Sequence, residues 1–200
     1  QIRSAKSGEA KALLKALQER MMSLATVHRE LYQTSGLADV RARELLPDIV
    51  RQIMAISAGP EKPFDVDIDI DDLRLIPDQA VPLSLLLAEA LTNAMKFSGA
   101  TRAAPGRLMV ALKRVGGSDA VLTVQNSHTD TMTRDLPPDM QGTGIGSQLI
   151  TALAQQLHGK YEFLASEGAY LLKVTFTVAP LSFAENRQAT AQNDWNDAPD

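Results

Sequence analysis

Apolar residues in the first quarter of the chain follow a helical spacing. Between about residues 9 and 33 they recur at alternating steps of three and four, a heptad seam made of Leu14, Leu17, Met21, Leu24, His28 and Leu31. So narrow a seam predicts a helix that packs lengthwise against other helices, including those of a second copy of the chain. After the turn at Ser35-Gly36, a second helix is predicted over residues 39–57, with a start that depends on whether Pro47 lies in its first turn.

The period changes to two after a segment rich in Pro and Gly at residues 58–63, which predicts a domain boundary. Four apolar residues, Phe64, Val66, Ile68 and Ile70, then alternate with four aspartates. The alternation predicts a half-buried strand whose carboxylates face water. A calcium loop counted from Asp65 would need Gly at its sixth position and Glu at its twelfth, where Ile70 and Ile76 stand, so we exclude it.

The remaining pattern predicts a mixture of helices and strands. Helices are expected over residues 78–97 and 147–158, the second one closed by Gly159. Strands are expected over 107–115, 120–126, 160–164 and 170–178, with the first two joined as a hairpin through 116–119. Residues 129–141 form a long polar loop, and from residue 183 the hydrophobic pattern is lost. We therefore divide the chain into a helical segment 1–57, a domain 58–182 and a disordered tail 183–200.

Composition narrows the classes of function. A net charge of −4 and a pI near 5.4 give no global electrostatic case for nucleic-acid binding, so an anionic ligand has to be held locally. The absence of Cys excludes disulfide scaffolds, thiolate zinc sites and cysteine nucleophiles, and fits a reducing, cytoplasmic compartment. No apolar run approaches the ~18 residues of a membrane-spanning helix, so we expect no direct membrane contact.

Three polar residues share one face of the predicted helix 78–97. Glu89, Asn93 and Lys96 recur at steps of four and three beside the apolar stripe. Taken alone, such a set also fits an ordinary solvated helix face. The string Glu89-Ala-Leu-Thr-Asn93-Ala-Met-Lys96-Phe97, however, resembles the asparagine box of the ATPase fold shared by sensor histidine kinases, gyrase, Hsp90 and MutL.

A glycine-rich segment lies directly before the predicted helix 147–158. Glycines let a backbone approach a polyphosphate, and the amides that open a helix add donors and a favourable dipole. A dinucleotide fold would need a preceding strand and Gly at position 147, which is Ser147, and a P-loop would need a following Gly-Lys-Ser or Gly-Lys-Thr. The segment instead resembles the second glycine box of the kinases: Gly142-Thr143-Gly144-Ile145-Gly146.

The resemblance implies a role for each matching residue. Asn93 coordinates the Mg²⁺ that bridges the phosphates of ATP, and Lys96 neutralises phosphate charge. Glu89 orients or deprotonates the attacking histidine. Backbone groups contact the nucleotide at Gly142, Gly144, Ile145 and Gly146. The family's first glycine box carries an Asp that binds the adenine amino group; Asn126 stands in its place, and its amide oxygen forgoes a charge-assisted hydrogen bond at a cost on the order of 1 kcal/mol.

The N-terminal helices extend the resemblance. Residues 24–32, Leu-Ala-Thr-Val-His-Arg-Glu-Leu-Tyr, resemble the second dimerisation helix of a subclass of bacterial sensor histidine kinases whose phosphoacceptor lies on the preceding helix in a His-Arg-x-Lys-Asn box. No such box is present, so the acceptor is expected upstream. His28 lies on the heptad seam, where a packed histidine sets the register of a bundle, and the subclass carries a histidine there without phosphorylating it.

The resemblance as a whole implies an α+β architecture in which a helical-bundle dimerisation segment precedes an α/β sandwich, a mixed sheet packed on about three helices. It implies a homodimeric kinase core that binds Mg-ATP, transfers the γ-phosphoryl group to a histidine and then passes it to a response regulator, with residues 129–141 as a lid. Two alternatives stay open. One is a dimeric phosphotransfer scaffold with a degenerate ATP pocket, and the other is a Ser/Thr kinase of the anti-sigma type, against which the heptad seam argues.

Overall fold

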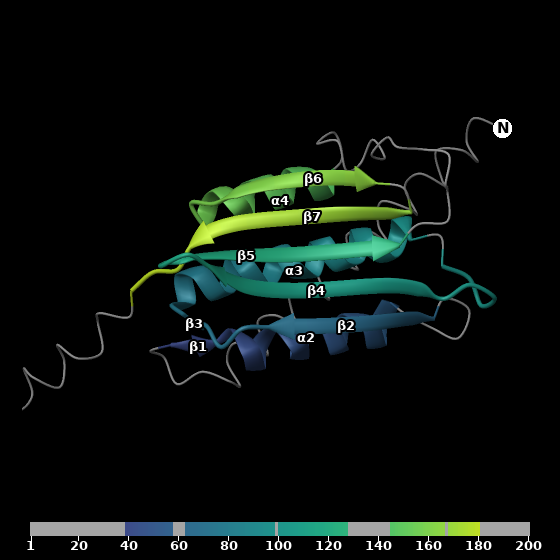
Figure 1. Cartoon of the computed structure of the whole chain (residues 1–200), viewed down its shortest axis with the longest axis horizontal. Helices are drawn as coiled ribbons and strands as arrows, with labels where there is room; N and C mark the ends of the chain where they lie inside the picture. The colour runs from purple at the N-terminus through teal and green to yellow at the C-terminus, as the bar shows by residue number, and fades with distance from the viewer. Residues whose placement is uncertain (1–38, 58–62, 99, 128–144, 167, 181–200) are drawn as a thin grey trace, which may run out of the picture.

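A five-stranded mixed sheet with helices on one face forms the protein (Figure 1). The computed structural model describes residues 39–57, 63–98, 100–127, 145–166 and 168–180. Across the sheet the order is β2 (Phe64–Ile70), β4 (Gly106–Val115), β5 (Asp119–Ser127), β7 (Ala169–Thr177) and β6 (Lys160–Ser166). The helices are α2 (Ala42–Ser57), α3 (Pro77–Phe97) and α4 (Ile145–Gln156). These elements confirm the predicted α+β architecture.

Two short strands were not predicted. β1 (Val40–Arg41) and β3 (Arg74–Leu75) pair antiparallel in a small separate sheet. The helix that we predicted from residue 39 therefore begins at Ala42, and Pro47 lies inside it. The heptad seam with His28, the loop 129–141, the glycines Gly142 and Gly144, and the tail 183–200 lie outside the described residues.

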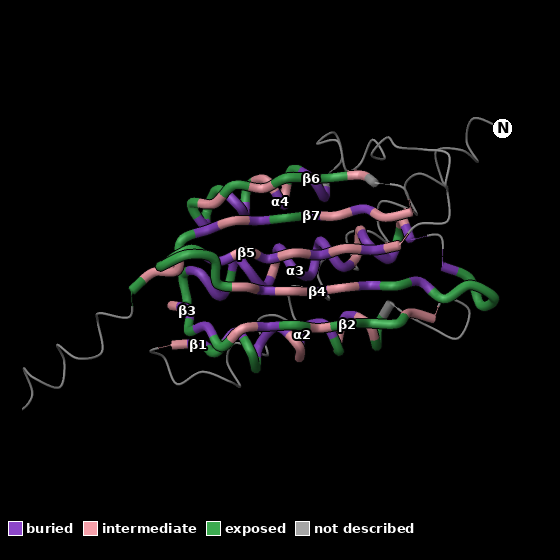
Figure 2. The backbone as a smooth tube through the Cα atoms, viewed as in Figure 1, coloured by how far each residue is buried: buried purple, intermediate pink, exposed green. Residues whose placement is uncertain are grey.

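The three helices of the described residues bury apolar side chains against the same face of the sheet. Figure 2 marks the buried residues of each helix in purple. Helix α2 contributes fully buried side chains to this core, among them Leu45, Leu46 and Ile49. It packs against α3 and β2, although it precedes the predicted boundary at residue 58. At about 25 cal/mol per Å² of apolar surface, this burial is the main force that holds the layers together.

Helix α3 is the crossover between the parallel strands β2 and β4, and the other neighbouring strands of the sheet are antiparallel. This arrangement carries α3 behind the centre of the sheet, where it packs on β5 and on α4 (Figure 1). Near its start, Gln79 donates to the Thr177 carbonyl at 2.7 Å and accepts from the Ala179 amide at 2.9 Å. The end of β7 is thereby fixed to the beginning of α3.

The end of α4 differs from the prediction. We expected Gly159 to close the helix, but His158 takes the left-handed conformation, with φ of 52°. Its amide bonds the Gln155 carbonyl and the Gly159 amide bonds the Ala154 carbonyl, which is the Schellman pattern. Glycine is needed at position 159 for another reason: a Cβ there would lie 2.6 Å from the Thr175 carbonyl oxygen of β7.

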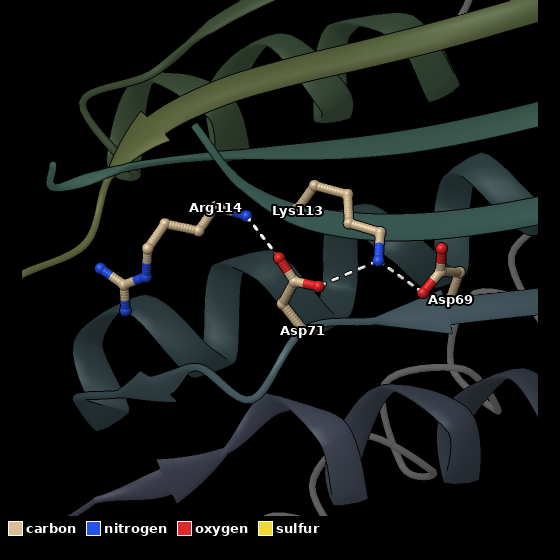
Figure 3. A network of polar contacts seen from close by, with 4 residues as sticks. All are labelled: Asp69, Asp71, Lys113 and Arg114. Carbon is tan, nitrogen blue, oxygen red and sulfur yellow. Dashed lines mark hydrogen bonds and ion pairs between the residues drawn. The ribbon is translucent and has the colours of Figure 1, made fainter. Parts of the chain in front are cut away.

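An ion-pair network fixes the end of β2 to β4 (Figure 3). The Asp71 carboxylate accepts the Arg114 backbone N–H and the Lys113 ammonium, both at 2.9 Å, and Lys113 also donates to Asp69 at 2.5 Å. The Arg114 N–H, followed by the Lys113 ammonium, lowers the pKa of Asp71 below its ordinary value of 3.8. Hydrogen bonds from Lys113 to Asp69 and Asp71 raise the pKa of Lys113 above 10.5.

These shifts predict a pH dependence of stability. As the pH falls below about 5, the unfolded chain binds a proton at residue 71 before the folded chain does, so the stabilisation by Asp71 is lost toward acid. The stabilisation by Lys113 is lost above pH 10.5. In urea denaturation at stepped pH, Asp71→Asn should flatten the acid decline, whereas Asp72→Asn, at the exposed neighbouring carboxylate, should keep it. An unchanged acid decline in Asp71→Asn would contradict the network's role.

Candidate functional site

The polar face of α3 runs from the protein interior to solvent. Glu89 is 6% exposed, Asn93 is partly exposed, and Lys96, in the last turn, is exposed. The Lys96 ammonium lies 4.8 Å from the centroid of the Phe97 ring, a cation–π distance. A solvated helix face would leave all three residues in water. Because Glu89 is buried, this face is not an ordinary solvated helix face, and the surrounding protein accommodates a carboxylate.

Gly146, in the first turn of α4, lies directly against Glu89 and Asn93. A Cβ at position 146 would overlap Oε1 of Glu89 and would lie 3.2 Å from Nδ2 and 3.3 Å from Oδ1 of Asn93. The requirement for glycine comes from this close approach, since no left-handed φ is present at Gly146. Two segments that are about fifty residues apart in the sequence thus meet at one point. The backbone entry to α4 faces a carboxylate and an amide of α3.

This arrangement favours binding of a cation together with an anion. The start of a helix carries partial positive charge and attracts phosphate oxygens, but the nearby Glu89 carboxylate repels them. A divalent cation between the two removes that repulsion, and the Asn93 amide oxygen is a hard ligand of the kind that Mg²⁺ takes. In the part of the chain that the structure describes, the Asn93 side chain makes no hydrogen bond and no group of three or more His, Asp or Glu could hold a metal ion. A Mg²⁺ ion would therefore take most of its ligands from phosphates and water.

Asn126 lies on β5 and lines a small cavity. It is 3% exposed on β5, and its Nδ2 donates to the Ser127 carbonyl at 3.1 Å. The cavity measures only about 10 Å³, so it holds at most about one water molecule. Asn126 lines it together with Ala90, Asn93, Ala94, Val124, Ile150, Phe163, Tyr170, Leu171 and Leu172. A nucleobase can enter only if these walls move apart.

The structure thus brings four of the predicted site residues together: Glu89, Asn93, Asn126 and Gly146. Lys96 lies two turns of helix beyond Glu89, and Ile145 begins α4. The apolar wall of the cavity was not predicted; it consists chiefly of Ile150, Phe163 and Tyr170. The pattern assigned them only to a helix and two strands, and their position around Asn126 follows from the packing of α4 and the strand order β5, β7, β6.

A larger groove lies elsewhere on the molecule. Its volume is about 510 Å³, and it opens at one end of β2, β4, β5 and β7, where its lining includes Asp65, Arg107, Met109 and Gln125. It touches none of the predicted site residues. In the described ranges, no helix is both long and apolar enough to cross a membrane.

The close contact at Gly146 predicts that a larger residue there lowers the free energy of unfolding. Gly146→Ala should lower the free energy of unfolding by about 1–3 kcal/mol, because Glu89 is buried and has little room to move away from the new methyl group. Gly117→Ala is the matched control: a Cβ there meets nothing within 4 Å, and we expect a change within about 0.5 kcal/mol. Chemical denaturation measures both, and equal stability of the two variants would refute the close approach.

Comparisons with known proteins find a family model and several solved structures that are similar to this chain. A family model described as histidine kinase matches residues 1–57. The chain is similar in structure to the histidine kinase domain of the blue-light activated kinase EL346 from Erythrobacter litoralis, with 19% identity, coverage of 84% of this chain and 82% of that one, and a TM-score of 0.67. Comparison with curated protein sequences gives no match.

Two further solved structures show the same similarity. A histidine kinase from Burkholderia phymatum has 16% identity, coverage of 88% of this chain and 85% of its own, and a TM-score of 0.56. The mycobacterial sensor histidine kinase MprB has 15% identity, coverage of 71% and 97%, and a TM-score of 0.54. At these identities the structures establish the fold alone. The family match over residues 1–57 and the histidine kinase catalytic-domain fold together support a bacterial sensor histidine kinase core.

Proposed function

We propose that this chain binds Mg-ATP between α3 and the first turn of α4, and that it transfers the γ-phosphoryl group to a histidine and then to a response regulator. The observation that carries the proposal is the contact of Gly146 with Glu89 and Asn93. It joins the two sequence boxes that the resemblance assigns to one nucleotide site.

Each residue of the site has a distinct task in this proposal. Asn93 supplies an amide oxygen to Mg²⁺, and the backbone amides at the start of α4 bind phosphate oxygens. Lys96 is exposed at the end of α3 and neutralises further phosphate charge. Bound Mg²⁺ would neutralise the charge of the phosphates. Glu89 orients the attacking histidine and accepts its proton.

In this proposal Asn126 binds the adenine base of ATP. Because Nδ2 of Asn126 already donates to the Ser127 carbonyl, its Oδ1 is the atom available to accept a hydrogen bond from an adenine amino group. The neutral amide gives a weaker bond than a carboxylate would. Opening of the 10 Å³ cavity further lowers the apparent affinity. We therefore expect weaker nucleotide binding than an aspartate at this position would give.

The N-terminal segment supplies the rest of the kinase core. Its match to a histidine kinase model supports a homodimer formed through these helices. We propose that the phosphoacceptor is a histidine other than His28. The division into residues 1–57, 58–182 and 183–200 stays a prediction.

Calorimetric titration with a non-hydrolysable ATP analogue tests the proposal. Saturable binding that requires Mg²⁺ is expected. No saturable heat at millimolar analogue would overturn nucleotide binding and would favour the phosphotransfer scaffold, to which the small cavity and Asn126 also point. With an added acceptor helix, phosphate on an acid-labile histidine supports the histidine kinase, whereas acid-stable phosphate supports a Ser/Thr kinase.

A further inference from the structure

A chain of hydrogen bonds joins the edge strand β6 to the first turn of α4. The Thr151 hydroxyl lies 2.8 Å from the Ser147 carbonyl oxygen and 2.7 Å from the Tyr161 hydroxyl. Threonine has one hydroxyl proton, and Thr151 donates it to the carbonyl. The Tyr161 hydroxyl must therefore donate to Thr151. Both bonds run in one direction, so each polarises and strengthens the other.

The series of hydrogen bonds ends at Ser147, one residue from the Gly146 contact on which the proposed function rests. Ser147 is 1% exposed and follows Gly146, which touches Glu89 and Asn93. Tyr161 therefore fixes the first turn of α4 from strand β6. A shift of a few tenths of an ångström in this turn would move its amides relative to Asn93, and helices packed in a core transmit such shifts because no free volume absorbs them.

Tyr161 has a second contact on the same face of the sheet. Its ring meets the edge of Phe163 at a centroid distance of 5.7 Å and an interplanar angle of 76°. Phe163 lines the small cavity beside Asn126. The ring and the hydroxyl of Tyr161 thus act on different parts of the site, and a change from tyrosine to phenylalanine separates them.

We propose that Tyr161 is a positioning residue for the triphosphate: through Thr151, its hydroxyl holds the first turn of α4 at the distance from Asn93 that Mg-ATP requires. The inference rests on the proposed function and assigns a role to a residue that the sequence boxes do not include. It assigns the hydroxyl to the phosphate side of the site and leaves the base side unaffected.

The test compares two ligands with Tyr161→Phe, Thr151→Val and the double variant of the full chain. The affinity for the Mg-bound ATP analogue should fall about threefold to tenfold in Tyr161→Phe, which loses one partly buried hydrogen bond, and at least as far in Thr151→Val, which loses two. The double variant should be no weaker than Thr151→Val, because both hydroxyls act through one chain. The affinity for adenosine, followed by NMR, should stay unchanged, and Thr151→Ser should bind the analogue like the unmodified chain.

Thr177→Val is the matched control, since it removes a hydroxyl that donates to Asp119 away from the site. Thermal unfolding confirms that every variant is folded. Lower thermal stability with unchanged affinity for the analogue, or an equal loss for analogue and adenosine, would overturn the inference while the proposed function stands. Absence of nucleotide binding in the unmodified chain would overturn both.

Discussion

Replacing Asn93 by alanine should weaken binding of the Mg-bound ATP analogue by about 100-fold or more. Removing a residue that only supports a metal ligand already costs 10–100-fold, and Asn93 is proposed as a ligand itself. Without its amide oxygen, Mg²⁺ would lose the one ligand that the proposal assigns to the described part of the chain. Binding of the analogue in the absence of Mg²⁺ should change much less, so the ratio of the two affinities measures the effect.

Gln155→Ala provides the control for loss of an amide, because Gln155 is exposed near the other end of α4. Its affinity for the Mg-bound analogue should equal that of the unmodified chain. If Asn93→Ala binds the analogue normally with Mg²⁺ present, the metal is held elsewhere and the proposed role of α3 fails.

Glu89→Gln should lower the rate of phosphoryl transfer to an added histidine acceptor by about 100-fold, the lower range for loss of a general base. The substitution preserves the shape of a buried side chain that lies against Gly146, so the packing of α3 on α4 should remain. Affinity for the Mg-bound analogue should change little. Initial rates of phosphate transfer at saturating ATP provide the measurement.

Glu162→Gln is the matched control, since Glu162 is an exposed carboxylate on β6. It should transfer phosphate at the normal rate. A normal rate in Glu89→Gln would show that Glu89 acts neither as a base nor through its charge. A loss of affinity equal to the loss of rate would instead assign it to nucleotide binding.

Local patterns predicted the elements of this fold well. The alternation of Phe64–Ile70 with aspartates gave β2 with its bounds, and the helix expected over 78–97 spans Pro77–Phe97. The predictions were less accurate where tertiary contacts determine whether an element forms or how it ends. β1 and β3 are two residues long and exist through their pairing, and the turn after α4 places His158 in the conformation expected for Gly159. Periodicity carries no information about either.

The candidate site was predictable only in part, for a similar reason. Glu89, Asn93 and Gly146 could be named because their sequence boxes resemble a known family. That Gly146 touches the other two follows from how α4 packs on α3, which no local pattern encodes. Likewise, Phe163 and Tyr161 were assigned to a strand, but their proximity to Asn126 and Thr151 depends on the order of β5, β7 and β6 in the sheet.

The central claim is that a metal-bound triphosphate lies between α3 and the first turn of α4. Replacing Mg²⁺ by paramagnetic Mn²⁺ in the complex with the ATP analogue tests it directly, because Mn²⁺ broadens the NMR signals of nearby amides. We predict selective loss of the amide signals around Asn93 and Gly146, with those of Val115 and Gly117, at the end of the β4–β5 hairpin far from Asn126, retained. Broadening that is strongest at Asp65 and Arg107 in the 510 Å³ groove, or spread evenly over the protein, would contradict the account.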